Sequence, residues 1–177
     1  MNWKKRIVSL ALAAVIGLST FLASGVEAEA AGAIAKGIDV SKYQGAINWS
    51  AVAAEGYSFA FIKVGSAKSG LDPYFAANMV GANAAGLKTG VYLYSYATTV
   101  EAAMAEAQFT LAAIAPFTVS MPVVFDLEDA VHKTMTPEQL QALTVVFCSI
   151  IQSAGYQPMV YSSKNWLTQR VGPIPHS

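Results

Sequence analysis

The sequence predicts an α/β fold in which a mostly parallel sheet forms a β/α barrel with about five β/α units. From Ala35 onward, short apolar runs alternate with helical patterns. Strands that are separated by helices pair in parallel, because a crossover segment joins them. The apolar runs are nearly continuous, as expected of strands covered on both faces. Polar or aromatic residues follow the runs, and in a barrel such strand ends converge on one mouth, where sites are built.

The alternative is an open, doubly wound sheet, in which the same strand ends would be spread along an edge. Sheets of that kind that bind nucleotides carry a Gly-rich phosphate loop after the first strand. No such loop follows the first expected strand, at 35–40. This difference favours the barrel.

The first half of the pattern contains three strands and two helices. The strands are expected at 35–40, 57–64 and 88–97. A short helix at 47–56 carries Trp49 as a packing residue and ends at Gly56, and a second helix is expected at 72–86. Proline near the start of the second helix and glycine at its end are typical of helix boundaries.

The second half continues the alternation. An alanine-rich helix is expected at 99–115, a strand at 121–127, a helix at 136–155, a strand at 157–163 and the beginning of another helix at 164. The helix at 136–155 has the strongest start signal, since Thr136 can cap it, Pro137 takes the first helical position and Gln139 completes a capping box. Cys148 in this helix is interpreted as a small buried hydrophobe rather than as a reactive thiol.

Residues 1–30 are expected to be a secretory signal peptide. Three basic residues at 4–6 precede an apolar stretch, and small residues ending at Ala28 and Ala30 fit the A-x-A type of cleavage site. An uncleaved membrane anchor is the alternative, but the apolar stretch is barely long enough to span a bilayer. We therefore expect a secreted, cell-wall-associated domain at 31–177, with no stable membrane association after cleavage.

The composition excludes several classes of function. The chain has 177 residues, with 11 acidic and 11 basic side chains, a length that suits one domain. Neutral net charge leaves no electrostatic footprint for nucleic acid, and no polybasic run marks a site for anionic lipid. Two histidines and one cysteine leave little for a zinc or thiol site. Nothing in the composition indicates an oligomeric state.

Three carboxylates, Asp126, Glu128 and Asp129, directly follow an apolar run at 123–125. Residues i and i+2 of a strand point to the same face, so Asp126 and Glu128 face together with Cα atoms about 6.6–6.8 Å apart. Mutual repulsion and partial burial raise the pKa of at least one of them, which suits a general acid beside an ionised group. Glycoside hydrolysis uses such a pair, and Asp39, at the end of the first strand, could supply a third acid at the same mouth.

Two other interpretations of these acids remain open. They could form a solvated turn that caps the next segment, because an isolated D-x-E pattern is a weak signal. A carboxylate metal site is also possible, although His132 is the only histidine nearby.

Aromatic residues favour the carbohydrate interpretation. Tyr92, Tyr94 and Tyr96 lie on one face of the third strand, where Tyr92 is expected in the core. A tyrosine at a strand mouth has a polar tip and a flat face on which a sugar ring can stack. Tyr161 and Trp166 extend the same set.

Four segments together resemble the glycoside hydrolase family 25 muramidases, the lysozymes of the bacterial and phage endolysin type. They are GIDVSKYQGAINW, FAFIKVG, DPYFAANMVGANAAGLKTGVYLYSYA and PVVFDLED. Their order and spacing agree with the family from Lys36 to about Trp166. The opening motif and the D-x-E strand are specific in combination, whereas neither is specific alone.

The resemblance implies a role for each acid. Glu128 matches the general acid, Asp126 the carboxylate that assists at the sugar centre, and Asp39 the acid of the first strand that lines the site. Four further residues are implied at the glycan: Tyr94, Tyr96, Tyr161 and Gln44. The implied reaction is cleavage of the β-1,4 bond between N-acetylmuramic acid and N-acetylglucosamine in peptidoglycan glycan strands. The implied fold is an irregular, TIM-like β/α barrel. The resemblance implies no metal or cofactor.

The sequence departs from the family at two places. The segment KVGSAKSG after the second strand lacks an acidic residue that many members carry. Only five strand candidates are present, whereas a complete barrel has about eight strands. We therefore expect 31–177 to be a family 25 lysozyme-like catalytic domain that lacks its last strands.

Two alternative functions follow from these departures. A protein with an incomplete barrel could bind the wall without cleaving it. A chitinase-like hydrolase is the other enzyme considered, but its usual signature carries further aspartates before the D-x-E, where this chain has the apolar residues 123–125.

Overall fold

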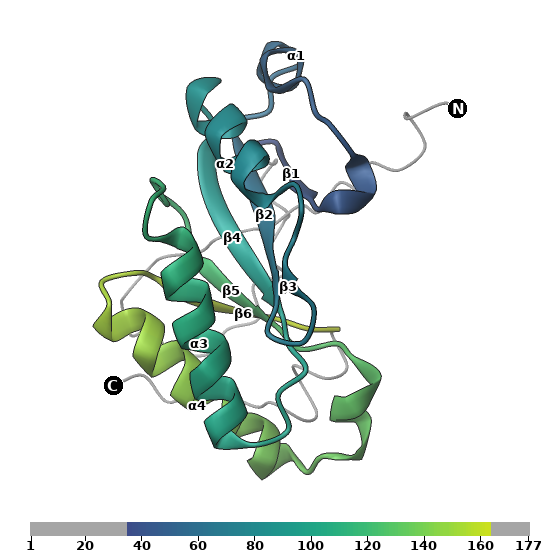
Figure 1. The fold of residues 1–177 in the computed structure, drawn as a ribbon, viewed down its shortest axis with the longest axis vertical. Coiled ribbons are helices and arrows are strands. Elements are labelled where there is room, and N and C mark those ends of the chain that lie inside the picture. The colour runs from purple at the N-terminus through teal and green to yellow at the C-terminus, as the bar shows by residue number, and fades with distance from the viewer. Residues whose placement is uncertain (1–34, 164–177) are drawn as a thin grey trace, which may run out of the picture.

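The structure is a computed structural model, and it describes residues 35–163 (Figure 1). The signal peptide expected at 1–30, the helix expected from 164 and Trp166 lie outside the described residues. Within 35–163, no helix is both long enough and apolar enough to cross a bilayer.

One six-stranded sheet organises the described residues. Its strands are β1 (Gly37–Val40), β2 (Phe59–Ser66), β3 (Gly70–Leu71), β4 (Lys88–Tyr94), β5 (Val123–Asp126) and β6 (Pro158–Tyr161). The order is β1-β2-β4-β5-β6 with parallel pairing throughout, and β3 pairs antiparallel with β2 off this path. The five expected strands and the mixed α/β class are confirmed. Within 35–163 the path ends at β1 and β6, so closure into a barrel stays a prediction.

Within 35–163, four α-helices connect the parallel strands, as expected from the crossover rule. They are α1 (Trp49–Ala54), α2 (Phe75–Ala84), α3 (Val100–Ile114) and α4 (Pro137–Ser153), and two short 3-10 helices are η2 (Lys42–Gln44) and η3 (Ala130–Thr134). Thr136 and Gln139 form the predicted capping box at the start of α4, with Pro137 in the first turn. Neither 3-10 helix was expected from the sequence.

The main core lies between the sheet and its helices. Helix α2 packs on β2 and β4, α4 packs on β5 and β6, and α3 packs on α4 and β2 (Figure 1). The strand register aligns Ile62, Val91 and Val123 in one row across β2, β4 and β5, and all three are fully buried. Burial of each such side chain contributes about 1.5–3 kcal/mol. Trp49 and Cys148 are buried as predicted.

The opposite face of the sheet is only half covered within 35–163, which differs from the expectation of two covered faces. The next row of the register aligns Lys63, Tyr92 and Val124, and Lys63 and Tyr92 are intermediate in burial. Strand β2 alternates between half-buried and buried positions over most of its length. The half-covered face forms the wall of a pocket.

A β-bulge at the end of β2 and strand β3 were not expected from the sequence. The register of β2 against β4 shifts between Lys63 and Gly65. Gly65 has φ +135°, and a Cβ atom there would lie 2.2 Å from the carbonyl oxygen of Gly70. Only glycine allows this close approach of β3 to β2.

Candidate active site

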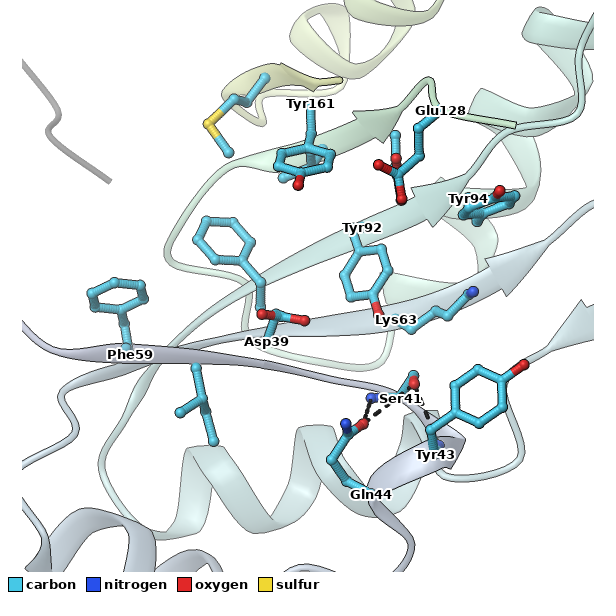
Figure 2. A pocket seen from close by; sticks show the side chains of 16 residues that line it. Asp39, Ser41, Tyr43, Gln44, Phe59, Lys63, Tyr92, Tyr94, Glu128 and Tyr161 are labelled. Carbon is cyan, nitrogen blue, oxygen red and sulfur yellow. Dashed lines mark hydrogen bonds between the residues drawn. The ribbon is translucent and has the colours of Figure 1, made fainter. Parts of the chain in front are cut away.

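A pocket of about 370 Å³ opens on the half-covered face of the sheet (Figure 2). That volume lies within the range of small-molecule sites. Every strand of the parallel path contributes to its wall, and the polar contributions come mainly from the carboxyl ends of the strands. The lining residues are Gly37, Ile38, Asp39, Ser41, Tyr43, Gln44, Phe59, Phe61, Lys63, Tyr92, Tyr94, Val124, Asp126, Glu128, Met159 and Tyr161.

The structure brings the three predicted acids, Asp39, Asp126 and Glu128, to this one pocket. Asp39 comes from β1, at one end of the strand path, while Asp126 ends β5 and Glu128 follows it. In Figure 2 the carboxylates of Asp39 and Glu128 both project into the pocket from its two sides. Acids from β1 and from the end of β5 therefore line the same pocket.

Leu127, which lies between Asp126 and Glu128 in the sequence, anchors both residues to the sheet. Its side chain is fully buried, as the alternation predicts. Its backbone N–H donates to the carbonyl oxygen of Tyr161 at 2.9 Å, and its carbonyl oxygen accepts from the Ser162 hydroxyl at 2.6 Å. These bonds continue the β5–β6 ladder past the end of β5 and hold Asp126 and Glu128 at fixed positions on the pocket wall.

Asp126 carries the strongest electrostatic perturbation of the three acids. It is only 5% exposed, and its Oδ1 atom is buried without a hydrogen-bond partner among the described residues. Burial raises its pKa from the ordinary 3.8 to about 7, with a further rise from the charges of Glu128 and Asp39 and an opposing effect of Lys63. Asp126 therefore holds a proton up to about neutral pH, as the sequence predicts for at least one member of the pair.

Glu128 and Asp39 are both exposed to solvent at the pocket, in contrast to Asp126. Burial of the Asp39 carboxylate raises its pKa, and a backbone hydrogen bond partly offsets that rise. The surrounding protein therefore removes part of the hydration of the Asp39 carboxylate, although the residue is accessible to solvent. The site combines one buried, proton-holding carboxyl group with two that a ligand can reach.

Asp129 has a different role from its neighbours. Its Oδ1 atom accepts from the backbone N–H of Val131 at 3.0 Å and so caps η3. Its Oδ2 atom accepts from the Tyr94 hydroxyl at 3.2 Å. The capping interpretation of this acidic run therefore holds for Asp129, whereas Asp126 and Glu128 face the pocket.

The tyrosines divide between the pocket and its surroundings. Tyr94 and Tyr161 line the pocket, and their contact with a glycan stays a prediction. Tyr96 is not among the lining residues and instead packs against Tyr94, with ring centroids 5.3 Å apart. Tyr92, expected in the core, lines the pocket and points toward Ser41 (Figure 2). Burial and the Asp39 charge both raise the pKa of Tyr92, so its hydroxyl stays protonated and can donate a hydrogen bond.

Gln44 lies on the pocket wall, but its side chain already has a structural partner. Its Oε1 atom accepts from the backbone N–H of Ser41 at 2.8 Å and from the Ser41 hydroxyl at 3.3 Å. The Ser41 hydroxyl accepts in turn from the N–H of Tyr43, which completes a capping box around η2. The amide oxygen of Gln44 therefore holds η2 in place at the pocket wall.

Lys63 is a pocket residue that the sequence analysis missed. Its ammonium group lies 4.7 Å from the ring centroid of Tyr94 and 5.8 Å from that of Tyr92. The signal was present, because Lys63 shares a strand face with Phe59 and Phe61 in an otherwise apolar run. Within residues 35–163, no group of three His, Cys, Asp or Glu side chains is arranged to hold a metal ion.

Comparisons with known proteins identify the family to which the sequence is similar. The sequence model described as "Glycosyl hydrolases family 25" matches residues 38–174. Lysozyme M1 of Streptomyces globisporus is 45% identical over 60 residues, which make up 34% of this chain and 20% of that protein. The protein YegX of Escherichia coli (strain K12) is 30% identical over 131 residues, 71% of this chain and 47% of its own length. The chain thus spans half or less of the length of these relatives.

The fold is similar to those of several solved structures. The modular autolysin LytC from Streptococcus pneumoniae matches with a TM-score of 0.68 and 27% identity, over 76% of this chain and 34% of that chain. A second structure of LytC, in complex with a synthetic peptidoglycan ligand, matches with a TM-score of 0.68 and 26% identity over the same shares. A bacterial lysozyme from Streptomyces coelicolor matches with a TM-score of 0.56 and 29% identity, over 67% of this chain and 58% of that chain.

Proposed function

The chain belongs to glycosyl hydrolase family 25, and we propose that it is a muramidase that cleaves the β-1,4 bond between N-acetylmuramic acid and N-acetylglucosamine in peptidoglycan. The observation that carries this proposal is the meeting of Asp39, Asp126 and Glu128 in one pocket, with Asp126 protonated up to about neutral pH. The LytC structure with a synthetic peptidoglycan ligand supports the same class of substrate.

Glu128 is the proton donor in this proposal, because its carboxyl group extends into the open pocket where the leaving oxygen can reach it (Figure 2). The donor transfers its proton to the glycosidic oxygen as the bond from that oxygen to the sugar C1 breaks. Water then supplies a hydroxyl group to C1, and its remaining proton returns to the carboxylate. The net result is one hydrolysed bond and a regenerated acid.

Asp126 supports the positive charge that develops at C1, either directly or by orienting the N-acetyl group of the substrate. Two neighbouring carboxyl groups share their protons, so the protonation steps belong to the pair. In the free pocket, burial favours the proton on Asp126. The reaction needs the proton on the donor and the negative charge on Asp126. The proposal therefore requires substrate binding to move the shared proton from Asp126 to the donor.

Asp39 and the tyrosines complete the proposed site. Asp39 lies on the opposite wall of the pocket from Glu128, where it can accept hydrogen bonds from sugar hydroxyl or amide groups (Figure 2). Tyr94 and Tyr161 offer ring faces to the glycan. We also propose that residues 1–30 direct the protein out of the cell, where the peptidoglycan lies.

The experiment that tests this function measures reducing ends released from purified peptidoglycan. We expect Glu128→Gln and Asp126→Asn each to lower kcat by at least about a hundredfold, with little change in circular dichroism. Glu55→Gln is the matched control, since Glu55 is exposed at the end of α1, outside the pocket. Full activity of Glu128→Gln would exclude Glu128 as the donor. Sedimentation with insoluble peptidoglycan without release of reducing ends would instead support a wall-binding role.

A further inference from the structure

Tyr43 is an exposed aromatic residue at the rim of the pocket, and nothing in the chemistry proposed above uses it. Its side chain is 70% exposed, the largest exposure of any large hydrophobic side chain in residues 35–163. It nevertheless belongs to the pocket wall. An aromatic ring held in water beside a binding pocket keeps its flat hydrophobic face available for a ligand.

The ring stands on a rigid support. Tyr43 is the middle residue of η2, whose capping box joins Ser41 to Gln44. Tyrosine has two side-chain torsions, so little conformational entropy is lost when a ligand orders it. The Lys42 ammonium lies 5.4 Å from the ring centroid of Tyr43, and the high exposure of the ring leaves area free for a ligand.

A second support reaches η2 from a distant part of the chain. Asp72 is buried, and its Oδ2 atom accepts from the backbone N–H of Lys42 at 2.9 Å. Its Oδ1 atom accepts from the backbone N–H of Tyr74 at 2.9 Å. The Oδ2 bond therefore holds η2 against the segment that precedes α2, while the Oδ1 bond fixes the carboxylate within that segment. Hydrogen bonds from a buried carboxylate to backbone N–H groups are among the stronger ones in proteins.

The position of Tyr43 extends the pocket on one side. In Figure 2 the Tyr43 ring lies across Lys63 from the Tyr94 ring. The Lys63 ammonium is in contact with the Tyr94 ring at 4.7 Å. Aromatic side chains from η2 and β4 thus line the pocket that holds the carboxylates, and most of the Tyr43 surface is open to water.

We propose that Tyr43 forms an outer sugar-binding subsite, in which its ring stacks on a saccharide unit beyond the two that flank the cleaved bond, and that Asp72 is its positioning residue. The inference rests on the proposed muramidase function and names a feature of the same site. A sugar ring presents C–H groups on its faces, which pack on the flat, exposed face of a tyrosine. The subsite therefore favours longer glycan strands over short fragments.

The experiment measures the dissociation constants of purified glycan fragments of two lengths, one that spans only the central pocket and one that is longer by several sugars. The full chain carries Glu128→Gln throughout, so that fragments remain intact during titration. Tyr43→Ala in this background is expected to weaken binding of the long fragments about five- to tenfold and to reduce the preference for long over short fragments. Tyr43→Phe retains the ring and is expected to retain the preference.

Asp72→Asn tests the positioning role. An amide nitrogen cannot accept from an N–H group, so the substitution leaves one acceptor oxygen for the N–H groups of Lys42 and Tyr74 and weakens the hold on η2. We expect the same selective loss for long fragments, and no additional loss when Asp72→Asn is combined with Tyr43→Ala, because both act through one contact. Additive losses would overturn the positioning role. Val80→Ala is the control, since Val80 is 61% exposed on α2, outside the pocket wall.

The outcomes separate this inference from the proposed function. Equal binding of long fragments by the parent and by Tyr43→Ala would overturn the outer subsite while leaving the muramidase proposal intact. A parent that binds no fragment, together with a wild-type chain that releases no reducing ends, would overturn the proposed function and the subsite with it. Because Tyr43 is on the surface, its substitution is not expected to disturb folding, and circular dichroism checks this.

Discussion

Asp126 is expected to destabilise the folded protein at neutral and alkaline pH, and Asp126→Asn should relieve this effect. The folded protein binds the Asp126 proton up to about pH 7, whereas the unfolded chain releases it near 3.8. Between these values the folded state binds more protons, so the free energy of unfolding falls as pH rises. The destabilisation is absent below pH 3.8 and complete above about pH 7.

The expected magnitude follows from the two pKa values. One pKa unit corresponds to about 1.4 kcal/mol, so the interval from 3.8 to about 7 corresponds to at most about 4 kcal/mol. Asparagine has nearly the same shape as a protonated aspartate but no charge to desolvate. We therefore expect Asp126→Asn to raise the free energy of unfolding by up to about 4 kcal/mol at pH 8, while the enzyme loses activity.

The assay is urea denaturation at a series of pH values from 4 to 8, with the wild type and Asp126→Asn compared at each pH. The difference between them should grow steadily with pH. Glu128→Gln is an internal check, because the Glu128 charge raises the pKa of Asp126, so this variant should show a weaker pH dependence than the wild type. A difference that is the same at pH 4 and pH 8 would refute the assignment of the raised pKa to Asp126.

Three other residues allow further predictions. His132 is fully buried, its Nε2 atom is 3.0 Å from the carbonyl oxygen of Ala97, and burial lowers its pKa below 6.5. The folded state therefore resists protonation of His132, and the free energy of unfolding falls as pH drops below 6.5. His132→Gln should reduce this fall, as measured by urea denaturation at a series of pH values. An unchanged dependence of the free energy of unfolding on pH would contradict the prediction. Lys63→Met should raise the pKa of Asp126 and so move the alkaline limb of kcat/KM, where the free pair loses its last proton, to higher pH. Lys68→Met, outside the pocket wall, should leave that limb in place. An alkaline limb that moves to lower pH in Lys63→Met would exclude this role. Glu106→Ala should lower the free energy of unfolding by about 2–4 kcal/mol, because the buried Ser95 hydroxyl and the Tyr96 N–H lose their acceptor. Glu106→Gln should lower it less. Equal losses for the two variants, measured by urea denaturation, would argue against the lost bonds as the cause.

Most of the fold was predictable because its signals are local. Helix α4 carries its own start signal in Thr136, Pro137 and Gln139, and each interaction of that cap spans three residues. The five parallel strands appear as apolar runs between helices, and parallel pairing follows from the connections. Strand β3, by contrast, has two residues and no apolar run, and it depends on the glycine at 65.

The candidate site was predictable where chemistry follows directly from a strand. Asp126 and Glu128 follow the apolar run of β5, and period-2 alternation puts both on one face with Leu127 on the other. The error about Tyr92 has a physical cause. The alternation correctly put Tyr92 on the same face as Tyr94, but it could not tell that this face is open within 35–163 rather than packed.

The sequence by itself determined the α/β class, the order of the elements, the family resemblance and the identity of the three acids, because all of these depend on residue types at short and regular spacings. Only the tertiary structure decided which acid holds the proton, because the pKa of Asp126 depends on burial and on charges from β1, β2 and the residue after β5. The same holds for Asp72, whose carboxylate supports η2 from 30 positions along the chain. Contacts at that separation, and the loss of water that accompanies them, exist only once the chain has folded.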